Sequence, residues 1–290
     1  MRPARFHYRA PETLAEVLDA LAADPDETSV LAGGQSLVPM LNMRLARPEV
    51  VLDLRRVDEL AGIERVNGHL RFGAMTRQRA IERDERVRAA LPLVPAALSH
   101  VAHTAIRTRG TIGGSLAHAD PSAELPAVAV ALEARLHVRA RDGARTVAAE
   151  DFFVAPLMTA LEPGELIEAI EIPIPPPRTG HGFHEVAATH GAFALAGAAA
   201  VVRLAPTGAV EHARLVLMGM SGTPLMADLS ALAGRPCDED ALAEVRARLQ
   251  DELQPVDDAH ASAAYRRRAG AAVAVRALRE AARMAREEQA

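Results

Sequence analysis

The sequence of 290 residues contains no lysine and no tryptophan, and its only cysteine is Cys237. Without lysine, the chain cannot form a Schiff base or complete a phosphate-binding loop that ends in Gly-Lys-Ser/Thr. A single cysteine excludes an intrachain disulfide, a cysteine-based zinc site and an iron–sulfur cluster held by this chain alone. Any redox chemistry must therefore come from a bound organic cofactor.

The composition also argues against several classes of protein. Aromatic residues make up 3% of the chain, too few for base-stacking platforms, and the net charge of -5 is unlike that of a nucleic-acid-binding protein. No apolar run reaches the roughly 18 residues of a membrane helix. The start, MRPARFHYRA, lacks the apolar core of a secretory signal. We therefore expect a cytoplasmic protein with no integral membrane segment, long enough for two domains.

The first 60 residues predict alternating strands and helices. Leu14, Val17, Leu18 and Leu21 recur at the helical period and define one apolar face. The order β-α-β-α-β is typical of a small, largely parallel unit. The predicted elements are an extended segment at 5–8, the helix around 14–21, a strand at 29–31, a helix around 37–45 and a strand at 50–54.

Later segments predict antiparallel strands and then helices. Asn67-Gly68 and Asp142-Gly143 are hairpin signals between strand-like runs. The run Pro175-Pro176-Pro177 can join neither a helix nor a central strand, so it marks a boundary. Elsewhere we predict helices over 76–100, a strand at 166–174, an antiparallel pair at 192–204 and 213–220, and helices at 227–233, 239–253 and 262–286.

Two similar phrases each place adjacent glycines before a serine: AGGQSL at 32–37 and TIGGSL at 111–116. Glycine permits a close approach to the backbone, and successive amides in such a turn form a concavity that suits phosphate oxygens. A single Gly-Gly pair is usually only a tight turn. Two copies favour a diphosphate, with Arg107 or Arg109 as possible neutralising cations. Neither phrase has the G-x-G-x-x-G spacing of a conventional dinucleotide fold.

The pattern of residues 116–126 predicts a loop that leads into a helix. His118 and Asp120 could form a metal-binding or acid–base pair. The alternative is that Asp120 caps a helix that starts at Pro121, with His118 packed beside it. The residue pattern favours the structural alternative. Glu124 could accept a hydrogen bond from a ribose hydroxyl or could be a surface acid.

Together these phrases resemble the FAD-binding medium subunit of molybdenum hydroxylases, the family that includes aerobic carbon monoxide dehydrogenase and xanthine dehydrogenase. The resemblance rests on the two glycine phrases, on RGTIGGS at 109–115 and on HADP at 118–121. It extends through PGELI at 163–167, EIP at 171–173 and the tail ASAAYRR at 261–267. The chain departs from the family with Ala192 for a frequent Asp, Met226 for a frequent Arg, and His184 for the Lys of xanthine dehydrogenases.

The resemblance implies an α+β fold. It implies a PCMH-type FAD-binding domain over residues 1–176, with lobes of about 1–55 and 56–176. A C-terminal domain of carbon monoxide dehydrogenase flavoprotein type, a three-stranded antiparallel sheet with a helical bundle, would follow over 177–290. FAD would lie between the lobes with its diphosphate on the glycine turns. The implied FAD-binding residues are Ala32, Gly33, Gly34, Gln35, Ser36, Leu37, Val101, Thr111, Ile112, Gly113, Gly114, Ser115, Glu124, Ile167, His184 and Phe193.

The function that the resemblance implies is electron transfer. The chain would pass electrons from the [2Fe–2S] clusters of a small partner, through FAD, to an external acceptor. The molybdenum cofactor would lie on a large partner. Phe193 is expected to cover the flavin ring, unless it is a core residue, and no residue is assigned as a general acid, a general base or a metal ligand.

Two other functions stay open at this point. The chain could be a standalone FAD-dependent oxidoreductase with its own small substrate, and His118, His184 or His190 would then be the acid–base candidates. It could also be an assembly subunit that has lost its flavin, although the intact glycine phrases argue against this.

Overall fold

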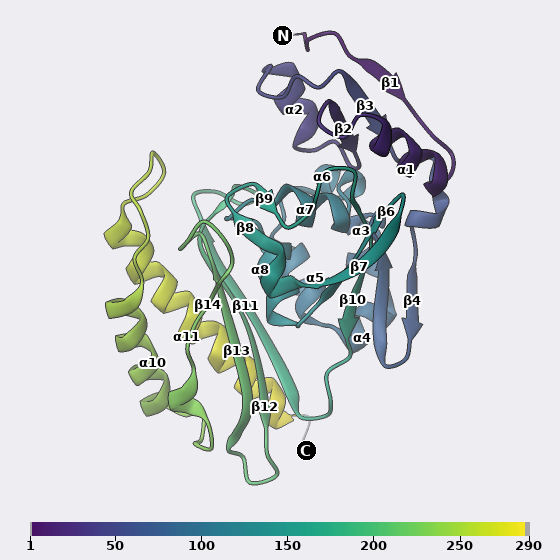
Figure 1. Ribbon diagram of the computed structural model, residues 1–290. Coiled ribbons are helices and arrows are strands. Elements are labelled where there is room, and N and C mark those ends of the chain that lie inside the picture. Colours follow the sequence, from purple (N-terminus) through teal and green to yellow (C-terminus); the bar gives the residue numbers. More distant parts are fainter. Residues whose placement is uncertain (1, 288–290) are drawn as a thin grey trace.

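The computed structural model describes residues 2–287, and its first unit is the predicted small parallel sheet (Figure 1). Strand β3 lies between β1 and β2, and all three strands run parallel. Thr13 and Glu16 form a reciprocal capping box at the start of α1, whose buried side chains are Val17, Leu18 and Leu21, as the periodicity predicted. The elements are β1 His7–Arg9, α1 Leu14–Ala23, β2 Thr28–Leu31, α2 Leu37–Asn42 and β3 Val50–Asp53.

The second unit is an antiparallel sheet in the order β4-β5-β10-β6-β7. Asn67 and Gly68 both have positive φ, which is the geometry of a tight two-residue hairpin turn. In the second hairpin, Gly143 already pairs with Ala140, so the turn lies one residue earlier than predicted. The strands are β4 Ile63–Val66, β5 His69–Gly73, β6 Arg135–Ala140, β7 Gly143–Ala148 and β10 Leu166–Pro173.

A group of short helices covers this sheet. All eight residues of α8 are buried, so it forms the centre of the core. The predicted cap at Asp120 is wrong: α8 starts at Glu124 after Ala123, and the Asp120 carboxylate accepts a hydrogen bond from the Ser122 backbone N–H. The elements are η1 Asp58–Leu60, α3 Gln78–Arg83, α4 Glu85–Ala90, α5 Leu93–Leu98, α6 Thr104–Arg109, α7 Ile112–His118, α8 Glu124–Ala131, α9 Ala149–Phe152, β8 Phe153–Ala155 and β9 Met158–Thr159.

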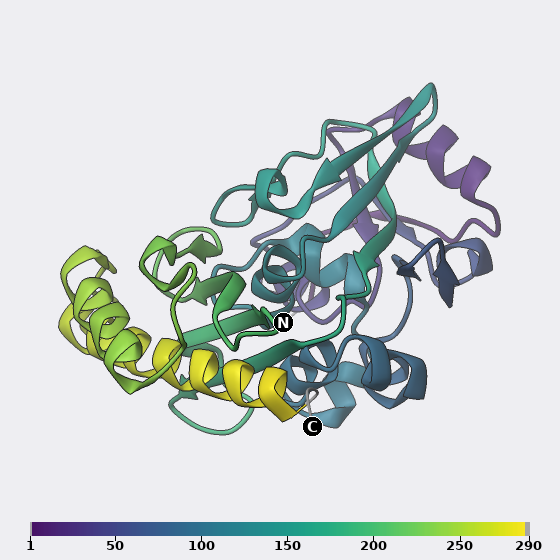
Figure 2. The same cartoon turned by 90° about the horizontal axis from the view of Figure 1, so that it is seen from below.

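The third unit is an antiparallel sheet in the order β11-β12-β13-β14, with two helices on one face (Figures 1 and 2). The predicted antiparallel pair is β12 and β13, and β14 is a two-residue addition at the edge. Of the predicted helix at 227–233, only one 3-10 turn forms. The elements are β11 Thr179–Ala187, β12 Ala194–Leu204, β13 Val210–Met218, β14 Leu225–Met226, η2 Ser230–Leu232, α10 Glu239–Glu252 and α11 Ala263–Glu287.

Two glycines let α11 lie directly on β11. A Cβ atom at Gly180 would lie 1.9 Å from the Ala281 carbonyl oxygen, and one at Gly182 would lie 2.1 Å from that of Ala277. Positions 180, 182 and 184 therefore lie on the strand face that contacts α11, because alternate residues of a strand share a face. The opposite face contributes Phe183 to the core of the second unit.

Candidate functional site

The first glycine phrase is a loop between β2 and α2. Gly34 has φ +74°, a conformation that favours glycine. Gly33 lies against the segment before α7, since a Cβ atom there would be 2.6 Å from the Arg109 carbonyl oxygen. The Gln35 side chain donates to the Gly33 carbonyl oxygen at 3.0 Å and closes the loop. This phrase therefore joins the first unit to the second.

This loop presents a series of unpaired backbone donors. Within the described residues, no protein group accepts a hydrogen bond from the backbone N–H groups of 32–37. These residues are half-buried and lie beside a cavity, so their free donors are available to an acceptor that binds there. Successive N–H groups of this kind suit the oxygens of an anionic group such as phosphate.

The second glycine phrase has a different structure from the predicted turn. Gly113 and Gly114 lie inside the first turn of α7, and the Thr111 hydroxyl caps this helix by accepting from the Gly114 N–H at 3.1 Å. The Gly113 N–H donates to the Ala74 carbonyl oxygen at 2.9 Å. A Cβ atom at Gly113 would lie 2.6 Å from that of Ala74, so close packing requires glycine there. The two phrases are thus not equivalent diphosphate turns, and the free donors belong to the first.

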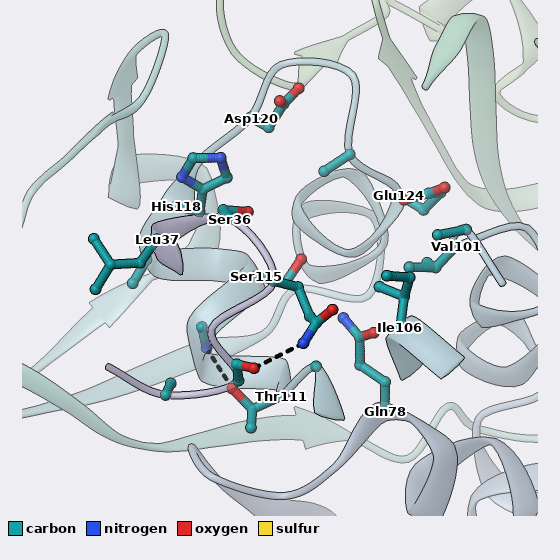
Figure 3. Close-up of a pocket in the computed structure, with 18 of the residues that line it drawn as sticks. Ser36, Leu37, Gln78, Val101, Ile106, Thr111, Ser115, His118, Asp120 and Glu124 are labelled. Atoms are coloured by element: carbon teal, nitrogen blue, oxygen red, sulfur yellow. Dashed lines mark hydrogen bonds between the residues drawn. The ribbon is translucent and has the colours of Figure 1, made fainter. Parts of the chain in front are cut away.

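Both phrases line one cavity of about 910 Å³, near the upper end of the range for cofactor sites of about 300–1,000 Å³ (Figure 3). All three units of the fold contribute to its walls. Phe193 stands at the cavity with 69% of its surface exposed. The candidates that line the cavity are Ala32, Gly33, Gly34, Gln35, Ser36, Leu37, Val101, Thr111, Gly113, Gly114, Ser115, Glu124, Ile167 and Phe193.

Two of the predicted binding residues do not line this cavity. Ile112 is buried in the core of the second unit. His184 lies on the α11 face of β11, where its ring nitrogen Nε2 is 3.1 Å from a carboxylate oxygen of Glu280. The structure therefore gives both side chains a packing or pairing role away from the cavity wall.

The arginines that we expected to neutralise a diphosphate lie outside the cavity as well. Arg107 is 7% exposed, and its guanidinium donates to the Val101 and Ala102 carbonyl oxygens at 2.8 and 3.1 Å. It also pairs with Glu82 at 3.1 Å. The Arg109 carbonyl oxygen accepts a hydrogen bond from Arg77. Arg107 thus holds the backbone of the cavity wall, and neither Arg107 nor Arg109 provides a cation inside it.

Glu124 is an acid in a nearly dry position. It is 8% exposed, and burial raises the pKa of its carboxyl to about 7, with added repulsion from Glu185 and Asp120. Nearby, His100 lies 3.4 Å from Glu185, whose hydrogen bond raises the pKa of the His100 ring. Burial therefore favours the protonated form of Glu124, and a protonated carboxyl can donate a hydrogen bond as well as accept one.

Sequence reasoning missed several residues of the cavity wall. Gln78, Ile106 and Leu161 line it, but none stands in a recognisable motif. Arg266 of α11 also lines it, donating to the Leu195 carbonyl oxygen at 2.7 Å and pairing with Asp258. This contact fixes the strand that follows Phe193. The only signal for Arg266 was its place in the tail segment at 261–267.

In residues 2–287, no helix is both long and apolar enough to span a lipid bilayer.

His118 and Asp120 both line the cavity, but they do not form a metal centre. Residues 2–287 contain no group of three or more His, Cys, Asp or Glu side chains able to hold a metal ion. The free backbone donors at 32–37 and the apolar walls, by contrast, suit an organic ligand with an anionic group.

Comparison with known proteins identifies the family and the cofactor of this chain. Residues 4–175 match the family described as "FAD binding domain in molybdopterin dehydrogenase", and residues 181–281 match "CO dehydrogenase flavoprotein C-terminal domain". The chain belongs to the FAD-binding medium subunits of molybdenum hydroxylases. This medium subunit is an oxidoreductase flavoprotein, and its cofactor is FAD.

Several relatives of this medium subunit match it along almost its whole length. The caffeine dehydrogenase subunit beta of Pseudomonas sp. (strain CBB1) is 38% identical, over 97% of this chain and 96% of the relative. The carbon monoxide dehydrogenase medium chain of Afipia carboxidovorans is 35% identical, over 97% and 98%. Among solved structures, quinoline 2-oxidoreductase from Pseudomonas putida 86 superimposes with a TM-score of 0.93 at 38% identity, covering 98% of this chain and 99% of the other.

The cavity of the medium subunit fits FAD on its own geometry. Its volume suits a large cofactor, its loop at 32–37 offers free donors for a diphosphate, and Val101 and Ile167 provide apolar walls for ring systems. The hydroxyl groups of Ser36 and Ser115 make no hydrogen bond within the described residues, so both are free to bind a ligand.

Proposed function

We propose that this chain is the electron-transfer subunit of a molybdenum hydroxylase, with FAD held in the cavity between the three units. The observation that carries the placement is the run of unpaired backbone N–H groups at 32–37 beside that cavity. When bound, FAD supplies the redox chemistry that takes electrons from the [2Fe–2S] clusters of a partner and delivers them to an external acceptor.

The residues of this chain bind and orient the cofactor. The loop at 32–37 holds the diphosphate, assisted by the hydroxyl groups of Ser36 and Ser115. Val101 and Ile167 pack against its rings, Phe193 covers the flavin, and Glu124 bonds a polar group of the nucleotide. We assign no general acid or base. We also assign residues 1–176 to the FAD-binding domain and residues 177–290 to the C-terminal domain.

The same proposal assigns the other redox centres to partner subunits. A chain with one buried cysteine cannot ligate two [2Fe–2S] clusters, so these belong to a small partner. Substrate oxidation belongs to a large molybdenum-containing partner. The names of the relatives support this division, because each names one subunit or chain of a dehydrogenase.

The first experiment is the visible spectrum of the chain purified alone, with identification of the chromophore released on denaturation. We expect a flavin spectrum and released FAD, and co-purification with a molybdenum subunit and an iron–sulfur subunit when all are expressed together. Oxidation of an organic substrate by the isolated chain would instead support the standalone oxidoreductase. A folded chain that refuses added FAD would contradict the proposal.

A double serine variant and a control test the placement of the cofactor. Replacing both Ser36 and Ser115 with Ala removes two hydroxyl groups that have no protein partner, so it should weaken FAD binding without weakening the fold. Ser99→Ala is the matched control, because the Ser99 hydroxyl donates to the Ala96 carbonyl oxygen and does not line the cavity. Equal FAD affinity in the double variant and the control would contradict the placement.

A further inference from the structure

Gln78 is a buried residue whose carboxamide has no hydrogen-bond partner among the described residues. It is the first residue of α3, and its backbone N–H donates to the Gly110 carbonyl oxygen at 2.9 Å. Only 5% of its surface is exposed, yet its carboxamide makes no hydrogen bond to any described residue. Its polar atoms are not among the fully buried, unpartnered atoms of the described structure, so they open onto the cavity, where a bound ligand can pair with them.

The carboxamide is aimed at the cavity. A Cβ atom at Gly110 would lie 2.6 Å from the Gln78 Oε1 atom and 3.2 Å from the Ile106 carbonyl oxygen, so both residues meet at this bare glycine. Figure 3 shows the side chain extending from α3 into the cavity, toward Ile106. All three residues line the same space. The absence of a side chain at 110 leaves room for the carboxamide to hold this orientation.

We propose that Gln78 is a further contact residue of the FAD site and that its carboxamide hydrogen-bonds a polar edge of the bound cofactor. This inference rests on the proposed FAD site. The chemistry of the position supports it, because a carboxamide presents a donor and an acceptor side by side, which matches the paired nitrogen and oxygen groups of heteroaromatic rings. The apolar side chains of Val101 and Ile106 in the same wall are suited to the faces of such a ring.

The test is Gln78→Met, which keeps the volume of the side chain and removes both hydrogen-bonding groups. FAD affinity is measured by titrating the apo-protein, and the stability of the apo-protein by its melting temperature. The dissociation constant for FAD should rise about three- to tenfold, the range for a lost neutral hydrogen bond. The melting temperature of the apo-protein should stay the same or rise, because the carboxamide makes no hydrogen bond to the described residues that Met would remove.

Gln250→Met on α10 is the control, since Gln250 lies outside the cavity, and it should change neither quantity. The proposal is overturned if Gln78→Met leaves the dissociation constant within twofold of wild type. It is also overturned if apo-protein stability falls together with affinity, because Gln78 would then act through the fold. If the wild-type chain takes up no FAD, the proposed FAD site itself is overturned. That outcome is distinct from failure of the Gln78 proposal, which shows only as a difference between variants of a chain that binds FAD.

Discussion

At the scale of single residues, His181 of β11 is buried without a hydrogen-bond partner. It is 5% exposed, and neither ring nitrogen is bonded within the described structure. Burial lowers the pKa of the ring from 6.5 to about 4, because the protonated ring would lose its hydration. The folded protein therefore holds His181 neutral at a pH where the unfolded chain would protonate it.

This predicts a loss of stability on acidification. The folded-state pKa lies below the unfolded one, so the cost is absent above pH 6.5 and grows as the pH falls toward 4. There it should reach about 3 kcal/mol, from about 1.4 kcal/mol per pKa unit. His181→Leu should remove this part of the pH dependence. Urea unfolding of both apo-proteins at pH 7.5 and 4.5 checks it, and an unchanged difference between the two proteins would contradict the prediction.

Sequence reasoning located those residues of the cavity that stand in a distinctive local pattern. The phrase at 32–37 was visible because adjacent glycines before a serine are informative by themselves. Gln78 was missed because a lone glutamine carries no pattern. The resemblance placed His184 at the cofactor, but the face on which a strand residue lies depends on register, and α11 binds that face.

At the scale of elements, a buried arginine holds α6 against the wall of the cavity. Arg107 donates two hydrogen bonds to Glu82 of α3 and two to the carbonyl oxygens of Val101 and Ala102. Ala102 has φ +42°, an uncommon conformation for alanine that its surroundings must impose. The guanidinium therefore stabilises the strained segment from which Val101 reaches the cavity.

Arg107→Met should destabilise the protein by about 3 kcal/mol, because it leaves the partly buried Glu82 carboxylate and two carbonyl oxygens with fewer partners. FAD affinity should fall with it, since the wall at 101–102 would shift. Arg79→Met removes the more exposed partner of the same Glu82 and should cost less than about 1 kcal/mol. Urea unfolding and FAD titration of the pair check this. Equal destabilisation by the two substitutions would show that Arg107 has no special role.

Helices and strands that are bounded by turn residues were predicted well. Those whose structure depends on packing against distant segments of the chain were not. The parallel unit and the Asn67-Gly68 hairpin follow from local signals alone. Strand β11 was not predicted from its residues, because it is rich in Gly and His, and its glycines serve the contact with α11. The phrase at 111–115 became the first turn of a helix because Thr111 caps it and Ala74 packs against Gly113.

At the scale of the whole molecule, the core and the cavity both cross the unit boundaries. One cluster of buried side chains joins Phe72 and Leu136 of the second unit to Phe183, Val201 and Met218 of the third. The first unit supplies the loop at 32–37, and the third supplies residues around Phe193 and Arg266. Relative movement of the units would therefore change the cavity. The shared core holds the second and third units, and the cavity walls they contribute, in fixed positions.

The charge of the whole molecule sets the last prediction. The chain has a net charge of -5, and the charged side chains of the cavity are four acids and one arginine, which is paired with Asp258. Uncharged backbone donors, rather than cations, must then hold the diphosphate.

This arrangement predicts how salt affects FAD binding. Salt weakens attraction between opposite charges, but in this cavity it would screen the repulsion between the acidic side chains and the diphosphate. FAD affinity should therefore stay constant or rise slightly between 50 mM and 500 mM NaCl (about a tenfold range of ionic strength). Titration of the apo-protein at each salt concentration checks this, and a steep fall in affinity would show that an arginine outside the described contacts binds the diphosphate.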